Sequence, residues 1–119
     1  MVLNTAGLAT KGSPMEDFDK SFEEKYGNAP ESIYSAVGYD LIKVIEAAVI
    51  IAGSTDPKKI RDAMADLENV QGATGLITYK GTNGMPVRQV SLIRVKDGGR
   101  ELVGQPSPDA NLIPAPRMQ

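Results

Sequence analysis

The sequence predicts a mixed α/β chain in which three helices come first and a short strand and a β-hairpin follow. Apolar residues recur at helical spacing up to residue 68. From residue 72 onward, short apolar runs alternate with turns rich in Gly and Asn, which is typical of strands. The 119 residues are 41% hydrophobic and 24% charged, as expected for a globular chain with one modest core.

The composition excludes several classes of function. The chain contains no cysteine and no histidine, so disulfides, thiolate chemistry and the usual general base and metal ligand are absent. The net charge is −2, and neither half is basic enough to neutralise a phosphate backbone. We therefore expect no enzymatic activity, no cofactor, no metal and no nucleic-acid partner.

The first helix is predicted from its boundaries and its apolar stripe. Ser13 can cap it, Pro14 suits the first turn, and Glu16 can return a hydrogen bond to the cap. Gly27 supplies the left-handed stop. The stripe has spacings of three, four and four residues and consists of Met15, Phe18, Phe22 and Tyr26.

The second helix is predicted over residues 31–53, within the most apolar stretch, "YSAVGYDLIKVIEAAVIIAGSTDP". Its uninterrupted apolar run, from Ala47 to Gly53, is far shorter than the roughly 20 residues that a membrane span needs. A helix that is apolar nearly all round is typical of one buried between other elements. We expect one buried face to contain Ile33, Val37, Leu41, Val44, Ala48 and Ile51.

The third helix and the strands follow from local signals. Asp56 can cap a helix that has Pro57 at its first position. A strand is predicted over residues 76–79, and a hairpin turns at Asp97-Gly98, a pair that tolerates positive φ. The first hairpin strand is expected to start at Val87 and to carry apolar residues on both faces, as in a sheet covered on both sides.

Three side chains in the second helix are candidates for a binding role. Asp40 is either a buried carboxylate bonded to nearby donors or a ligand contact. Tyr34 and Tyr39 either pack in the core or form the wall of a small-molecule pocket near the start of the helix.

Two long segments carry a resemblance to a known family. They are "FDKSFEEKYGNAPESIYSAVGYDLIKVIEAAVIIAGSTDPKKIRDAM" and "GATGLITYKGTNGMPVRQVSLIRVKDGG". The order of their motifs resembles the periplasmic branched-chain amino acid binding proteins of ABC transporters, which have the type I periplasmic binding protein fold. The resemblance covers residues 7–105 and corresponds to the carboxy-terminal third of such a protein.

The resemblance implies a fold and one site residue. Residues 1–105 would be the carboxy-terminal segment of a periplasmic-binding-protein-like domain, and residues 106–119 a proline-rich extended tail. The α/β fold would be completed by self-association into a homo-oligomer, in which elements can be exchanged between copies. Tyr34 matches an aromatic residue that approaches the ligand in the family, whereas Asp40 would be structural.

The resemblance also implies a function. The chain would be a fragment of an ABC-transporter substrate-binding protein for branched-chain or related amino acids, contributing a core helix and the hinge and hairpin rather than the main ligand site. Its partners in the parent protein would be the amino acid and an ABC permease, in the periplasm or another extracytoplasmic compartment. The stretch "MVLNTAGLATKGSP" lacks the features of a signal peptide. Two alternatives stay open, a ligand-sensing regulatory domain of the same fold and a self-associating remnant without ligand binding.

Overall fold

The computed structural model describes residues 2–4, 8–109 and 111, and within them three helices and six short strands. The helices are α1 (Pro14–Tyr26), α2 (Ile33–Ala52) and α3 (Pro57–Ala65). The strands are β1 (Val2–Asn4), β2 (Val70–Gly72), β3 (Gly75–Thr78), β4 (Val87–Arg88), β5 (Ser91–Lys96) and β6 (Gly99–Gly104). The predicted order of helices before strands is confirmed for residues 8–104.

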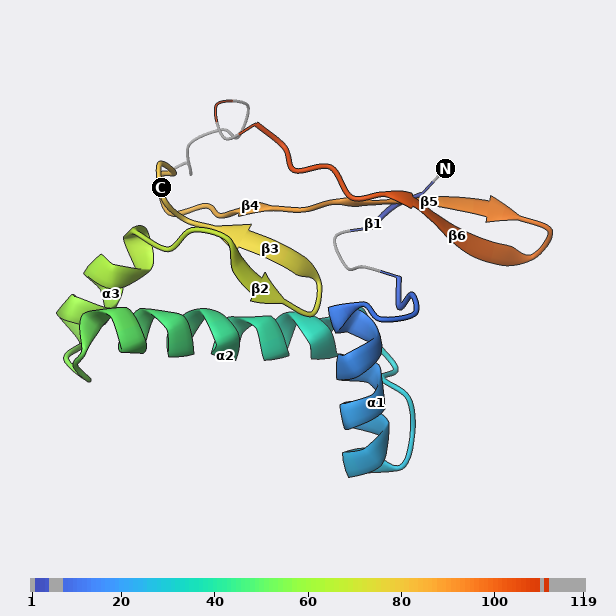
Figure 1. Cartoon of the computed structure of the whole chain (residues 1–119), viewed down its shortest axis with the longest axis horizontal. Coiled ribbons are helices and arrows are strands. Elements are labelled where there is room, and N and C mark those ends of the chain that lie inside the picture. The colour runs from blue at the N-terminus through green and yellow to red at the C-terminus, as the bar shows by residue number, and fades with distance from the viewer. Residues whose placement is uncertain (1, 5–7, 110, 112–119) are drawn as a thin grey trace, which may run out of the picture.

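The strands form two separate antiparallel sheets, with the orders β2-β3-β4 and β1-β5-β6. In Figure 1, α2 runs beneath the first sheet, α1 stands across one end of α2, and α3 lies at the other end. The β5-β6 hairpin extends away from the helices, on the side opposite α3. The chain therefore has a helical part that carries one sheet and a second sheet that projects from it.

The passage from β4 to β5 joins the two sheets and is held by hydrogen bonds. The side chain of Gln89 accepts a hydrogen bond from the Leu76 amide at 2.9 Å. The Val90 amide donates to the Pro106 carbonyl at 3.0 Å. Next along the chain, the buried Ser91 accepts a hydrogen bond from the Gln105 side-chain amide at 3.0 Å. Residues 89–91 thus run beside residues 105–106 where the chain leaves the helical part.

Four helix ends lie where the sequence places them, whereas α2 begins at Ile33, after the cap Ser32, rather than at residue 31. The Ser13 hydroxyl accepts a hydrogen bond from the Glu16 amide at 3.2 Å, and the Asp56 carboxylate accepts from the amides of Lys58 and Lys59. The carboxylate of Glu16 accepts from the Gly12 amide at 2.7 Å rather than from the cap residue itself. The stops at Gly27 and Gly53 have the expected positive φ values of 75° and 54°.

Two small apolar clusters form the core. One joins α2 to β3 and to the segment just after α3 through Val44, Ala48, Leu67 and Ile77. The other joins the start of α1 to α2 and the β2-β3 turn through Met15, Phe18, Ala36 and Ala73. Both clusters lie on the same face of α2, the one turned toward the β2-β3 hairpin.

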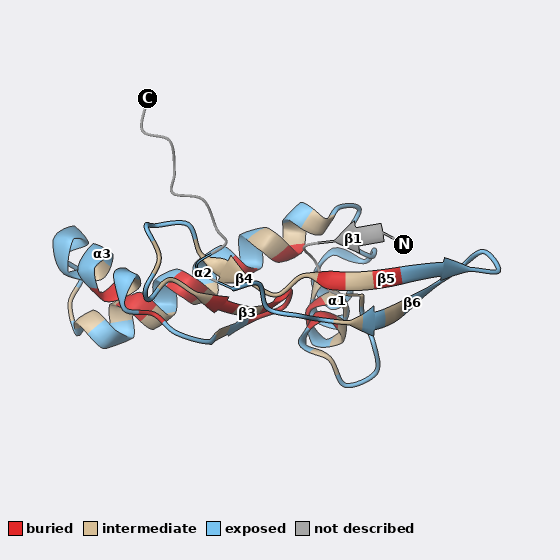
Figure 2. Cartoon of the chain, turned by 90° about the horizontal axis from the view of Figure 1, so that it is seen from above, coloured by how far each residue is buried: buried red, intermediate tan, exposed pale blue. Residues whose placement is uncertain are grey.

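The prediction that the second helix is buried nearly all round is wrong for the structure described. Only Ala36, Asp40, Val44 and Ala48 of α2 are buried. Two members of the expected buried face, Leu41 and Ile51, are 55% and 61% exposed. The physical reason is visible in Figure 2, where the β2-β3 hairpin and α3 cover one side of α2 and leave the others pale blue or tan.

The strands differ from the prediction in three places. β2 was not predicted, and it pairs with β3 through Val70 and Ile77. β1 was not predicted either, and it pairs with β5. The strand expected to run unbroken from Val87 is interrupted, because β4 pairs with β3 and belongs to the other sheet, while β5 pairs with β6. The expected covering of both faces also fails, since Val95 is exposed.

The hairpin turn is confirmed, because Asp97 and Gly98 have φ values of 51° and 77°. Residues 106–109 carry no helix or strand. Most of the predicted tail, residues 110 and 112–119, lies outside the described residues.

Candidate functional site

A buried carboxylate on α2 holds together three segments of the chain. Asp40 is 1% exposed and accepts hydrogen bonds from the backbone amides of Ala73 and Thr74, at 2.6 and 3.2 Å, and from the Thr74 hydroxyl. Arg88 of β4 completes the group, because its Nη2 donates to Asp40 at 3.1 Å and to the Thr74 hydroxyl at 2.7 Å. We call Asp40, Thr74 and Arg88 the polar cluster.

The polar cluster exists because the β2-β3 turn closes directly on α2. Gly72 pairs with Gly75, so Ala73 and Thr74 form the tip of the hairpin. A Cβ atom on Gly72 would lie 2.5 Å from Asp40 Cγ, so only glycine lets the strand approach this closely. The structural reading of Asp40 is therefore confirmed, since its carboxylate is occupied by protein donors.

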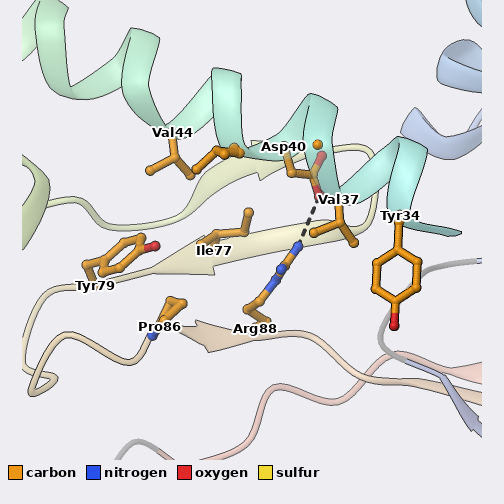
Figure 3. A pocket seen from close by; sticks show the side chains of 10 residues that line it. Tyr34, Val37, Asp40, Val44, Ile77, Tyr79, Pro86 and Arg88 are labelled. Atoms are coloured by element: carbon orange, nitrogen blue, oxygen red, sulfur yellow. Dashed lines mark hydrogen bonds and ion pairs between the residues drawn. The ribbon is translucent and has the colours of Figure 1, made fainter. Parts of the chain in front are cut away.

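A groove runs beside the polar cluster, between α2 and the edge formed by β3 and β4. Its volume is about 360 Å³, and Arg88 lies in its lining with Asp40 behind it. Figure 3 shows Tyr34 at one end and Tyr79 at the other, with Val37 between them. The other apolar lining residues are Leu41, Val44, Ile77 and Pro86. We call this the tyrosine groove.

Tyr34 is placed by the first turn of α2, where its backbone amide donates to the Ser32 hydroxyl at 3.2 Å. Its side chain is 78% exposed and points away from the helix in Figure 3. Of the two readings open for this residue, packing in the core is wrong. The ring is instead available to a molecule that enters the tyrosine groove.

The structure brings together two of the three candidates taken from the sequence. Tyr34 and Asp40 line the same groove, whereas Tyr39 lies elsewhere and packs on Phe18 with ring centroids 5.4 Å apart. Arg88 and Tyr79 were missed. One signal could have found Arg88, because it is the only charged residue between positions 81 and 93, and an arginine that packs into a fold there needs an acidic partner.

Chemically, the tyrosine groove offers an apolar surface, two phenol rings and an arginine whose charge is balanced by Asp40. Within residues 8–109, the carboxylates form no group of three that could hold a metal ion. No helix among the described residues is both long and apolar enough to cross a bilayer. The arrangement fits recognition of a small molecule by shape and apolar contact.

Solved structures similar to this chain share its fold over most of its length. A leucine binding protein, LivK, of Thermotoga maritima matches with a TM-score of 0.64 and 28% identity, over 87% of this chain and 29% of that protein. A structure assigned to a branched-chain amino acid ABC transporter of Rhodospirillum rubrum matches with a TM-score of 0.75 and 24% identity, over 85% and 29%.

A third structure is the solute binding protein of an ABC transporter from R. palustris, solved in complex with benzoate. It matches with a TM-score of 0.67 and 22% identity, over 88% of this chain and 29% of that one. This chain therefore spans less than a third of the length of each of the three solved proteins. A search of curated proteins found no match.

A family model described as "Periplasmic binding protein" matches residues 4–100. That range includes all three helices, both clusters of the core and the whole polar cluster. The chain belongs to the periplasmic binding protein family.

Proposed function

We propose that this chain is a segment of an ABC-transporter substrate-binding protein for branched-chain or related amino acids. The family match supports a binding role, and the leucine binding protein of T. maritima supports the class of ligand. The segment contributes a core helix, one wall of the solute site and the passage between two lobes. The main ligand-gripping residues lie on other sequence.

The observation that carries this proposal is the position of Tyr34. Its ring stands on a rigid helix start, is largely exposed and lines the tyrosine groove. An aromatic ring in that setting offers a large apolar contact to an aliphatic or aromatic side chain of a ligand. Asp40 and Arg88 support the wall from behind by fixing β3 and β4 on α2.

The passage at residues 89–91 supports a hinge role. Along the chain this stretch connects the first sheet to the second, and its residues are hydrogen-bonded to residues 105–106, which follow β6. In the proposed parent protein, the ligand is caught when two lobes close about this passage, because some contacts form only in the closed state. The closed form is then recognised by an ABC permease at the membrane, which places the protein in the periplasm or an equivalent compartment.

A chimera tests the proposal. These 119 residues replace the matching part of the T. maritima leucine binding protein, and leucine binding is measured by calorimetry. We expect the folded chimera to bind leucine, and Tyr34→Ala to weaken binding about tenfold, because it removes a contact worth about 1.4 kcal/mol.

Two variants serve as controls for the chimera. Tyr34→Phe keeps the ring and should bind nearly as well, and Tyr39→Phe changes a tyrosine outside the tyrosine groove. A folded chimera that binds leucine equally well with and without the Tyr34 ring would contradict the assignment of this residue.

The second candidate function is a self-associating protein without ligand binding. It is favoured by the apolar side chains exposed along α2, which include Leu41, Ile42, Ile50 and Ile51. Such a face is normally covered by protein. We expect sedimentation velocity to show self-association at micromolar concentration, weakened by Ile42→Glu but not by Val95→Glu in the other sheet. A well-folded monomer at that concentration would exclude this candidate.

A further inference from the structure

Residues 79–86 form the loop between β3 and β4, and this loop contains the only Asn-Gly pair in the sequence, Asn83-Gly84. Both residues are exposed. Gly84 has a φ of 86°, a left-handed conformation that glycine adopts without strain. The loop therefore exposes an asparagine whose neighbouring backbone nitrogen belongs to a residue without a side chain.

The hydrogen bonds of this loop stop before Asn83. The Thr82 amide and the Thr82 hydroxyl both donate to the Tyr79 carbonyl, at 3.0 and 2.6 Å. Pairing with β3 resumes at Val87. Within the part of the chain that the structure describes, no hydrogen bond engages the Asn83 side chain or the Gly84 amide. Among these residues, the Asn-Gly pair is held only through the two ends of the loop.

An asparagine is labile when the backbone nitrogen of the next residue can reach its side-chain carbonyl carbon. A glycine in the next position favours this approach, because it has no Cβ atom to obstruct it. The attacking nitrogen must also give up its proton to a base, and water must complete the reaction, so both groups need to be exposed and free of hydrogen bonds. Asn83 and Gly84 meet these conditions in the described structure.

We propose that Asn83 is a site of spontaneous deamidation. The Gly84 backbone nitrogen loses its proton to a solvent base and bonds to the side-chain carbonyl carbon of Asn83. The side-chain nitrogen of Asn83 takes up a proton and leaves as ammonia, so that a succinimide ring remains. Water then opens the ring at either carbonyl and gives aspartate or isoaspartate at this position. Water is the only co-reactant.

The modification alters the loop at one end of the tyrosine groove. Tyr79 and Pro86 belong to this loop and line the groove, and Figure 3 shows them at the same end of it. Either product adds one negative charge, which takes the net charge from −2 to −3. Isoaspartate also lengthens the main chain of the loop by a carbon atom. The charge and the path of the loop therefore change, whereas the polar cluster keeps its atoms.

Two other exposed asparagines serve as internal controls. Asn28 is followed by Ala29, and its side-chain amide donates to the Ala29 carbonyl at 3.2 Å. Asn69 is followed by the branched Val70, and its backbone amide donates to the Thr78 hydroxyl at 2.9 Å. In both cases a Cβ atom stands beside the attacking nitrogen, so we expect both to react much more slowly than Asn83.

Peptide mapping of the full chain tests the proposal. The folded chain is incubated at mildly alkaline pH, digested with trypsin and analysed by mass spectrometry, and a freshly purified sample digested in the same way gives the background. Trypsin separates Asn83, Asn28 and Asn69 into the peptides 81–88, 26–43 and 62–80. We expect peptide 81–88 to convert into an aspartate form and an isoaspartate form while the other two peptides stay unchanged.

The rate of conversion tests whether the folded loop permits the reaction. Opening a loop that is held only at its ends costs little free energy, so the folded chain should react at a rate within about threefold of that of a synthetic peptide 81–88. Circular dichroism of the incubated chain shows that it remains folded.

Two glycine variants of the same loop test the role of the Gly84 nitrogen. Gly84→Ala places a Cβ atom beside this nitrogen and should slow the conversion about tenfold. Gly81→Ala makes the same change at another positive φ, 76°, with nothing within 4 Å of the new atom, and should leave the rate unchanged. Circular dichroism of each variant shows whether it is folded.

Several results would overturn the proposal. One is conversion of either control peptide as fast as peptide 81–88, and another is equal slowing by the two glycine variants. An aspartate product without isoaspartate would mean that water attacks the side chain directly. A folded chain slower than the limit given above would show that the loop protects Asn83. None of these results depends on leucine binding in the chimera, since the reaction needs no ligand.

Discussion

Asp40 shows how one buried residue joins elements that are far apart in the sequence. Its carboxylate accepts hydrogen bonds from the hairpin tip, which is 33 and 34 residues later in the sequence, and from Arg88 of β4, which is 48 residues later. The two backbone amides it accepts from would otherwise be buried without a partner. The same contacts fix the wall of the tyrosine groove.

We predict that Asp40→Ala lowers the free energy of unfolding by about 3 kcal/mol, because it leaves Arg88 without its charged partner and two backbone amides without their acceptor. Urea unfolding followed by circular dichroism measures the change. Asp62→Ala is the matched control, since Asp62 pairs with Arg61 on the surface and should contribute less than about 1 kcal/mol. Similar losses for the two variants would refute the structural role given to Asp40.

Glu16 gives a pH prediction at the start of α1. The Gly12 amide, and then the ammonium group of Lys20, lower the pKa of Glu16 below its ordinary value of 4.5. Because folding lowers this pKa, the ionised carboxylate stabilises the folded state above about pH 4.5, and the effect is lost as the pH falls through the folded pKa.

Thermal unfolding of Glu16→Gln checks this. The native chain should be more stable than the variant near neutral pH, and the difference should vanish in acid. Glutamine keeps an oxygen that can accept from Gly12, so the comparison isolates the charge. An advantage that stayed constant down to strongly acidic pH would mean that the charge of Glu16 does not contribute.

At the scale of elements, a glycine in α2 and a glycine in the β2-β3 hairpin differ in whether a larger residue could replace them. Gly38 lies inside α2, and a Cβ atom there would meet nothing within 4 Å. Gly72 lies in β2, and a Cβ atom there would collide with the Asp40 carboxylate. Gly38 therefore lowers the stability of α2 without a packing reason, whereas Gly72 is required by the close packing of β2 on Asp40.

We predict that Gly38→Ala raises the free energy of unfolding by about 1 kcal/mol, since alanine favours the helix. Gly72→Ala should lower it by about 2 kcal/mol, since the buried hairpin cannot move aside without breaking the polar cluster. Chemical denaturation of both variants provides the comparison. If both substitutions stabilised the chain, the close approach of β2 to α2 would be wrong.

The sequence predicted the elements whose signals are local. Ser13, Asp56, Gly27 and Gly53 mark helix ends because capping depends on residues within one turn. The Asp97-Gly98 turn was predictable for the same reason. The short strands β2 and β4, of three and two residues, were not, because they are defined by pairing with β3.

The candidate site was only partly predictable. Tyr34 was placed in it by resemblance, and Asp40 by its position in an apolar helix. Arg88 comes from β4 and Tyr79 from the loop after β3, so their place beside α2 follows from the β2-β3 hairpin that docks there. Which face of α2 is buried was also not predictable, since it depends on what covers the helix rather than on the helix itself.

At the scale of the whole molecule, the structure has two incomplete features that belong together. The apolar flanks of α2 are exposed, and among the described residues the walls of the tyrosine groove come from α2, β3, β4 and the loop between these two strands. The chain spans 29% of each of the solved proteins it resembles. Both features fit our proposal that the remaining walls of the solute site and the cover of α2 are supplied by other sequence.

Calorimetric titration of the isolated chain with leucine, isoleucine and valine tests this proposal most directly. Because the chain holds one wall of the site, the account predicts no saturable heat at micromolar concentrations of any of the three. Binding in the micromolar range that Tyr34→Ala weakens would contradict it, since the 119 residues would then contain a complete amino-acid site.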